Sequence, residues 1–150
     1  MAGIKEKLLE FCWASVDEKT TRLKKRSAEL QESLGSETKS SAGDKHETGR
    51  AMVQLEQEKL GNQLVELDKT KAILQKVDIA KESSKTVLGS LVKTSGADYF
   101  IAVSTGVYTN GGTSIFCISP GAPIAQLLLG KQKGDKIVFN GKEIEVLEVQ

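Results

Sequence analysis

The sequence predicts an α+β protein in which a long antiparallel α-helical coiled-coil hairpin precedes a small antiparallel sheet with one helix. Three observations predict it: the first 80 residues contain no proline, two heptad series run through them, and short β-type runs begin at Val87. Of the 21 basic and 20 acidic residues, 15 of each lie in residues 1–82, whereas both prolines and 9 of the 14 glycines lie in residues 83–150. We therefore expect a hairpin over residues 1–80 with its tip at 35–47, a linker over 81–86 and a C-terminal domain over 87–150.

Apolar residues recur every seven positions in two series of four. In an antiparallel pair of helices, the two residue numbers of every facing pair add up to the same value. Here the outermost and the innermost pairs give the same value. The two series therefore fit a single register, folded between Ser41 and Ala42. The facing pairs are Leu9 with Leu74, Val16 with Leu67, Leu23 with Leu60, and Leu30 with Val53.

The residues between the two series are those of a helix stop and a turn. Leu34-Gly35-Ser36 predicts the end of the first helix, and the small residues at 40–43 predict a short connection. Each helix would have about 30 residues and a length on the order of 45 Å at ~1.5 Å per residue. Polar side chains such as Lys19 and Lys71 fall beside the heptad stripe, which favours a thin two-helix arm. A coiled-coil spacer or dimerisation rod is the alternative, with contacts through Leu8, Phe11, Trp13 and Ile73.

The tip of the hairpin carries an acidic pair, Asp44 and Glu47. Residues three apart in the first turn of a helix share one face, and two neighbouring carboxylates can hold Mg²⁺ when other molecules supply the remaining ligands. The structural alternative is helix capping, because an aspartate followed three residues later by a glutamate is close to a capping box. His46, the single histidine, could move a proton beside the pair.

A basic cluster lies on the first predicted helix. Most such clusters are solvated helix faces, but phosphate contacts would follow if RNA lies along the arm. The residues that we expect near nucleic acid are Arg22, Lys24, Lys25 and Arg26.

The C-terminal region has the period and the turns of a small sheet. Asn110-Gly111-Gly112 and Asn140-Gly141 are hairpin turn signals. A short apolar helix is expected over residues 123–129, after a loop that contains Pro120 and Pro123 and offers a docking surface. The expected strands are 87–94, 99–104, 114–119, 136–139 and 142–149.

The two cysteines and the ends of the chain indicate a cytoplasmic protein. Cys12 and Cys117 lie in different regions and have no CxxC spacing, so they are expected to be free thiols in a reducing compartment. Charged residues interrupt the apolar stretch near the N-terminus, and no run reaches the ~20 residues that span a bilayer. We expect no membrane association.

Two motifs resemble the GreA/GreB family of transcript-cleavage factors. Gly43-Asp44-Lys-His-Glu47 is similar to the family's G-D-x-x-E tip. The segment from Ala122 to Lys131, the following Gly134-Asp135 and the closing Glu145–Val149 run resemble the family's C-terminal pattern. The resemblance covers nearly the whole chain in the right order and spacing.

The resemblance implies a partner, a metal and a mechanism. The partner would be bacterial RNA polymerase with its nascent RNA: the arm would enter the secondary channel, and an FKBP-like C-terminal domain would dock on the channel rim through Gly121, Ala122, Pro123 and Ile124. Asp44 and Glu47 would share a Mg²⁺ with the polymerase, which then cleaves its own backtracked RNA. The chain would have no cofactor or small-molecule substrate of its own and would not be an enzyme alone.

The sequence departs from the family pattern at the tip and in the docking loop. Lys45 stands where a leucine is customary, Ala122 where a serine is, and Thr48-Gly-Arg-Ala51 replaces N-A-E-Y. These changes bear on cleavage more than on binding, so a non-cleaving secondary-channel regulator and a coiled-coil interaction protein are the alternatives.

Two enzyme classes are disfavoured by the residues available. A thiol acyl-transfer enzyme would need a histidine beside Cys12 or Cys117, and the single histidine is at the tip. A prolyl isomerase would need several clustered aromatic side chains around a proline pocket. The region offers only Tyr99, Phe100, Tyr108, Phe116 and Phe139, of which two are expected in the core.

Overall fold

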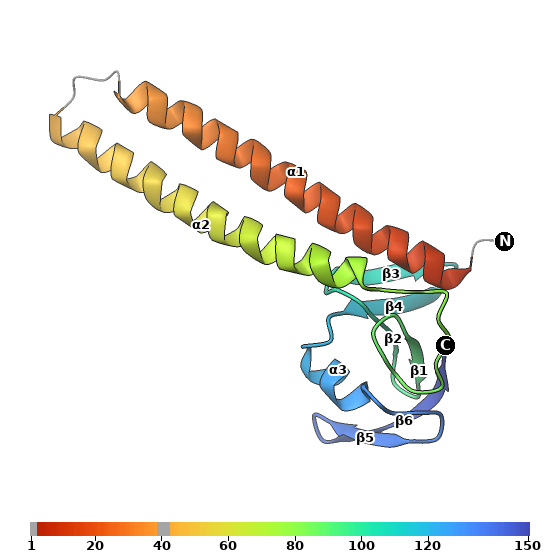
Figure 1. Cartoon of the computed structure of the whole chain (residues 1–150). Helices are drawn as coiled ribbons and strands as arrows, with labels where there is room; N and C mark the ends of the chain where they lie inside the picture. Colours follow the sequence, from red (N-terminus) through yellow and green to blue (C-terminus); the bar gives the residue numbers. More distant parts are fainter. Residues whose placement is uncertain (1–2, 39–42) are drawn as a thin grey trace. The chain divides into compact units, whose positions relative to one another are not determined.

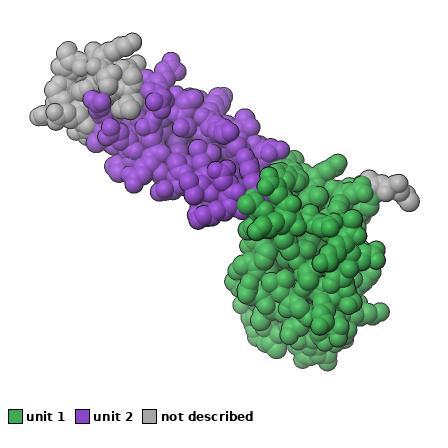
Figure 2. Space-filling view, viewed as in Figure 1, with its two compact units in different colours: residues 1–15, 72–150 green, residues 16–71 purple. Residues whose placement is uncertain are grey.

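The computed structural model describes the backbone of residues 3–38 and 43–150, and the side chains of residues 3–33 and 49–150 (Figure 1). The chain divides into two compact units (Figure 2). Unit 2 is the continuous segment Val16–Lys71, whereas unit 1 combines Met1–Ser15 with Ala72–Gln150. Each unit has its own packing and is described separately.

Unit 2 is a pair of antiparallel helices. It contains most of α1 (Ile4–Thr38) and α2 (Gly43–Gln75), which run side by side in opposite directions (Figure 1). The heptad positions Val16, Leu23, Leu30, Leu60 and Leu67 are 3–8% exposed, and Val53 is half-buried. The predicted hairpin is confirmed, because two apolar stripes in this spacing can be buried together only when they face each other.

The predicted helix stop at Leu34-Gly35-Ser36 is wrong, since α1 continues through these residues to Thr38. A glycine inside a helix costs only about 1 kcal/mol relative to alanine, which flanking turns of good helix formers can offset. The predicted fold point between Ser41 and Ala42 lies outside the described residues, as does most of the predicted turn. The helix α2 begins at Gly43.

Truncation of a buried heptad residue is expected to destabilise unit 2. We expect Leu60→Ala, at a position 6% exposed, to lower the free energy of unfolding by about 2–3 kcal/mol. The substitution removes buried methyl groups from a thin interface, where few neighbouring side chains can move to fill the cavity. Val65→Ala, at a position 54% exposed on the same helix, is the matched control and should cost at most about 0.5 kcal/mol. Urea unfolding followed by helical circular dichroism would compare them, and equal losses would contradict the assigned interface.

Unit 1 contains a six-stranded sheet with one short helix packed on it. The strands lie in the order β3-β4-β2-β1-β6-β5 (Figure 1). The elements are β1 Leu91–Thr94, β2 Asp98–Ile101, β3 Gly106–Asn110, β4 Thr113–Ile118, α3 Pro123–Leu128, β5 Lys136–Phe139 and β6 Lys142–Val149.

The sheet is mixed, so the expected all-antiparallel sheet is wrong. β2 and β4 pair in parallel, with Tyr99 opposite Phe116, while the other pairs are antiparallel. The parallel pair arises because β3, a strand that the sequence analysis did not assign, lies between β2 and β4 in the sequence and takes the edge of the sheet. The chain then reverses at the β3–β4 turn and returns beside β2 in the same direction.

Both predicted hairpin turns are present. Asn140 and Gly141 connect β5 to β6 with φ of 52° and 78°, and Gly111 and Gly112 connect β3 to β4 with φ of 57° and 86°. Two consecutive positive φ values are those of a type I′ turn, which favours asparagine and glycine. These turns fix the register of both hairpins.

The core of unit 1 lies between α3 and the sheet. Ile124, Ala125 and Leu128 of α3 pack in one cluster with residues of β1, β2, β5 and β6, namely Val92, Ile101, Ile137 and Val146. The helical ends that belong to this unit are also buried, with Leu8 and Cys12 at 0% and Leu74 at 1% exposure. The rings of Phe11 and Tyr108, the latter on β3, form a T-shaped pair with centroids 5.4 Å apart. The first turns of α1 therefore pack on the β3–β4 part of the sheet.

Within the described part of the chain, no helix combines the length and the apolar character needed to cross a membrane.

Candidate partner-binding surfaces

The acidic pair of the predicted tip is described only through its backbone. α2 begins at Gly43, so Asp44 and Glu47 fall in its first turn. Their side chains, and that of His46, lie outside the described residues. Helical backbone at both positions places the two residues on one helix face, as a shared cation requires. An N-cap residue lies outside the helix, so Asp44, which follows the first residue of α2, does not take the N-cap position of the predicted capping box. The shared cation stays a prediction.

The loop before α3 is held by hydrogen bonds within unit 1. The Ala122 backbone is extended (φ −64°, ψ 145°) and leads directly into Pro123, the first residue of α3. The Ala122 N–H donates to the Ser119 carbonyl at 3.1 Å, and the Gln126 side-chain amide donates to the Pro120 carbonyl at 2.6 Å. Because proline fixes φ at the start of the helix, the loop needs little ordering when a partner binds.

The four predicted docking residues do not all face outward. Gly121 and Pro123 are exposed and Ala122 is half-buried, whereas Ile124 is only 7% exposed and belongs to the core cluster. Ile124 therefore anchors the loop, and the first three residues present its outer surface.

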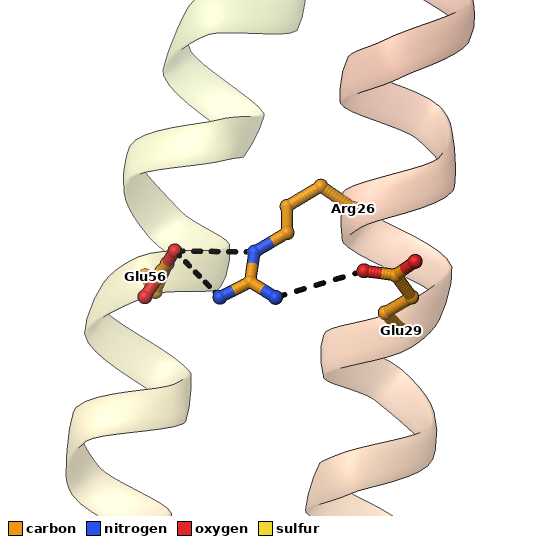
Figure 3. Close-up of polar contacts among 3 residues, drawn as sticks. All are labelled: Arg26, Glu29 and Glu56. Carbon is orange, nitrogen blue, oxygen red and sulfur yellow. Dashed lines mark hydrogen bonds and ion pairs between the residues drawn. The ribbon is translucent and has the colours of Figure 1, made fainter.

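The basic cluster lies on α1 in unit 2, and all four residues are exposed. Arg26 bridges the two helices: its Nη2 and Nε atoms donate to Glu56 Oε1 of α2 at 3.1 and 3.4 Å, and its Nη1 lies 3.6 Å from Glu29 Oε2 (Figure 3). Lys19 of α1 borders a shallow groove that Lys59 of α2 also lines, so both helices contribute positive charge. Arg26 is thus engaged with two carboxylates, whereas Arg22, Lys24 and Lys25 make no ion pair with another described residue.

The Arg26–Glu56 pair is expected to contribute little stability. Both side chains are about half exposed (49% and 47%), and exposed pairs contribute roughly 0.2–1 kcal/mol. A double-mutant cycle with Arg26→Ala and Glu56→Ala, measured by urea unfolding, should give a coupling energy in this range that shrinks at high salt. A coupling energy that is larger and unaffected by salt would contradict this interpretation.

The two cysteines lie together, which the sequence analysis missed. Both are free thiols, as predicted, and both are buried. Cys12 Sγ lies 3.5 Å from Thr105 Oγ1, and a hydrogen bond from the Cys117 thiol lowers the pKa of Cys12 to about 7. The same hydrogen bond, followed by burial, raises the pKa of Cys117. The sequence does not predict that the two cysteines are close, because their proximity depends on how α1 packs on β4.

The structure also bears on two of the alternatives. Leu8 is fully buried and Phe11 packs on Tyr108, so these two residues of the proposed dimerisation rod are engaged within unit 1. Among the aromatic residues considered for a proline pocket, Phe100 is fully buried and Tyr108 packs on Phe11, while Tyr99 stacks on Phe116 with centroids 5.9 Å apart. The aromatic side chains are thus divided between separate contacts.

The comparisons with known proteins give similarities without placing the chain in a family. No protein-family model matches the chain, and no curated protein sequence matches it. Among solved structures, the prokaryotic transcription elongation factor GreA/GreB from Nitrosomonas europaea is 26% identical over 55% of this chain and 78% of that chain, with a TM-score of 0.30. The transcription factor Gfh1 is 22% identical over 89% of this chain and 90% of that chain, with a TM-score of 0.35.

Proposed function

We propose that this chain is a transcription elongation factor that binds bacterial RNA polymerase through the secondary channel and stimulates cleavage of backtracked RNA. The observation that carries the proposal is the antiparallel helix pair whose second helix starts at Gly43, next to the Asp44-x-x-Glu47 motif. This arrangement sets an acidic pair at the helix start, where the sequence resembles the tip of the GreA/GreB factors.

The acidic pair would act inside the partner's active site. Carboxylates three residues apart in a first helical turn can direct oxygens to a common cation, and Mg²⁺ commonly takes one or two protein carboxylates. Bound there, a second Mg²⁺ would supply an activated water and stabilise the leaving oxygen of the RNA phosphodiester. Asp44 and Glu47 would hold and orient these groups, and the polymerase would supply the remaining ligands.

Two further surfaces fit contacts outside the active site. The rigid loop Gly121-Ala122-Pro123, anchored by Ile124, is proposed to dock on the rim of the channel. The exposed Arg22, Lys24 and Lys25 are proposed to lie near the phosphates of nascent RNA. We also propose that the C-terminal domain is FKBP-like.

A non-cleaving regulator that binds the same channel is the second candidate, and one observation favours it. Met52 and Leu55, three residues apart on α2, are 66% and 67% exposed. They follow the segment in which Arg50 stands at a position that is acidic in the family pattern. Exposed apolar side chains on one helix face suit a protein contact that does not depend on the acidic pair.

The test is addition of the purified protein to a backtracked elongation complex with Mg²⁺. We expect the RNA to shorten from its 3′ end faster than in the polymerase alone, with release of short 3′ fragments. Binding without faster shortening would support the non-cleaving regulator. Absence of binding to the polymerase would overturn both candidates.

A further inference from the structure

The thiols of Cys12 and Cys117 form a buried polar cluster within unit 1, independent of the acidic pair and the docking loop. Cys12 is in α1, and Cys117 is in β4, opposite Gly106 of β3. Thr105 precedes Gly106, and its Oγ1 lies 3.5 Å from Cys12 Sγ. The two cysteines are 0% and 2% exposed. The packing of α1 on the β3–β4 hairpin therefore brings together two thiols that are far apart in the sequence.

The surroundings of the Cys12 sulfur favour its deprotonated form. Cys12 Sγ and Thr105 Oγ1 share a hydrogen bond of 3.5 Å, and interactions with Cys117, Thr105 and the Val103 backbone lower the pKa of Cys12 against the opposing effect of burial. Together they stabilise a thiolate at Cys12 in spite of its burial, while Cys117 keeps its proton. A thiolate next to a protonated thiol is the arrangement of an attacking and a resolving cysteine.

We propose that Cys12 and Cys117 are a peroxide-oxidisable pair that forms a reversible disulfide between α1 and β4. This proposal does not rest on the proposed function. It concerns a covalent modification within unit 1, and its readouts require neither polymerase nor RNA.

The chemistry has two steps, and the oxidant is a hydroperoxide. The Cys12 thiolate attacks one peroxide oxygen: an S–O bond forms, the O–O bond breaks, and water or an alcohol leaves after protonation. Cys12 is thereby oxidised by two electrons to a sulfenic acid. The Cys117 sulfur then attacks the Cys12 sulfur, so that the S–S bond forms, the S–O bond breaks, and the hydroxyl leaves as water with the Cys117 proton. A dithiol reductant reverses the reaction by exchange.

The disulfide would constrain unit 1. It would close a loop of about 100 residues, which restricts the unfolded chain strongly, and it would fasten the α1 segment that carries Cys12 to the sheet. Because both sulfurs are buried, the oxidant reaches them through local opening of the helix end, so oxidation is expected to be slower than that of an exposed thiol.

The experiment treats the full chain with hydrogen peroxide, quenches the reaction, unfolds the protein and alkylates the remaining thiols. We expect alkylatable thiols to fall from two to none, with a monomer on a non-reducing gel and a cross-linked peptide pair containing Cys12 and Cys117 by mass spectrometry. The thermal unfolding midpoint should rise on the order of 10 °C, and dithiothreitol should reverse it. Two thiols that survive prolonged treatment, continued long after free cysteine is fully oxidised and under conditions that allow local opening, or a disulfide-linked dimer, would overturn the proposal.

Matched variants separate the two roles. In Cys117→Ser, the serine hydroxyl can still donate to Cys12, so we expect Cys12 to stop at the sulfenic acid and to be trapped by a 1,3-diketone reagent. In Cys12→Ser, Cys117 lacks a stabilised thiolate, and we expect at least about 10-fold less trapping. Circular dichroism would confirm that both variants are folded. Equal trapping in the two variants would overturn the assignment.

Discussion

Replacement of Asp44 and Glu47 by Asn and Gln is expected to slow RNA cleavage in a backtracked elongation complex by on the order of 100-fold, the usual effect of removing a charge-stabilising group from a reaction centre. The amides have nearly the same shape as the carboxylates but carry no charge to hold a cation. Asparagine and glutamine have helix propensities close to those of aspartate and glutamate, so α2 should keep its start. Affinity for the polymerase should therefore change little, which separates loss of chemistry from loss of binding.

The matched control removes two negative charges elsewhere on the same helix. Glu58→Gln with Asp68→Asn changes the net charge equally, at two exposed positions of α2. Cleavage rates and competition binding to the polymerase would be measured for both double variants. If the control slows cleavage as much as the tip variant does, the general charge of the helix pair is responsible, and the assigned role of Asp44 and Glu47 is wrong.

Phe100→Ala is expected to lower the free energy of unfolding of unit 1 by about 3–5 kcal/mol. Phe100 lies in β2 and is 0% exposed, so its truncation leaves a cavity in the sheet's packing. Whole domains are stable by only about 5–15 kcal/mol, so the variant would be close to unfolding. Phe116→Ala in the neighbouring β4 is the matched control: Phe116 is 41% exposed and stacks mainly on Tyr99, so a loss of about 1 kcal/mol is expected.

Trp13 makes this comparison measurable in unit 1. It is the single tryptophan, it is half-buried, and it lies in the part of α1 that belongs to this unit. Urea titration followed by its fluorescence would report the unfolding midpoint of each variant. Similar midpoints for Phe100→Ala and Phe116→Ala would contradict the core as described.

The elements that the sequence predicted best are those encoded by local patterns. Each heptad series lies within one helix, so burial of Leu23 and Leu60 could be expected from spacing alone. The β5–β6 hairpin was predicted with its bounds because Asn140-Gly141 allows a two-residue turn and alternating residues flank it. The short helix that begins at Pro123 was predicted for the same kind of reason.

The features that sequence reasoning missed depend on contacts between distant segments. β3 is mostly exposed and contains Gly106 and Asn110, so its strand character comes from pairing with β4 and not from its own pattern. The parallel β2–β4 pair follows from the edge position of β3. The contact of Cys12 with Cys117 follows from the packing of α1 on the β3–β4 hairpin. No local sequence motif predicts the strand pairings or this contact.

The residues of the candidate site were predicted from short motifs. The structure adds the position, burial and contacts of several of them. It sets Asp44 and Glu47 in the first helical turn and shows that Ile124 anchors the loop from inside the core. It also separates Arg26, which bridges to Glu56, from the other basic residues of its cluster. Neither the burial of Ile124 nor the partner of Arg26 could be predicted without the register of the helices and the position of α3.

The most direct measurement of the central claim is the location of residue 45 in the complex with the polymerase. A Lys45→Cys variant in a background of Cys12→Ser and Cys117→Ser would carry an iron chelate whose hydroxyl radicals cut neighbouring chains. We expect cuts in the polymerase around its catalytic carboxylates and in the backtracked RNA. Cuts confined to the outer surface of the polymerase, in a complex that still binds, would contradict entry of the acidic pair into the active site.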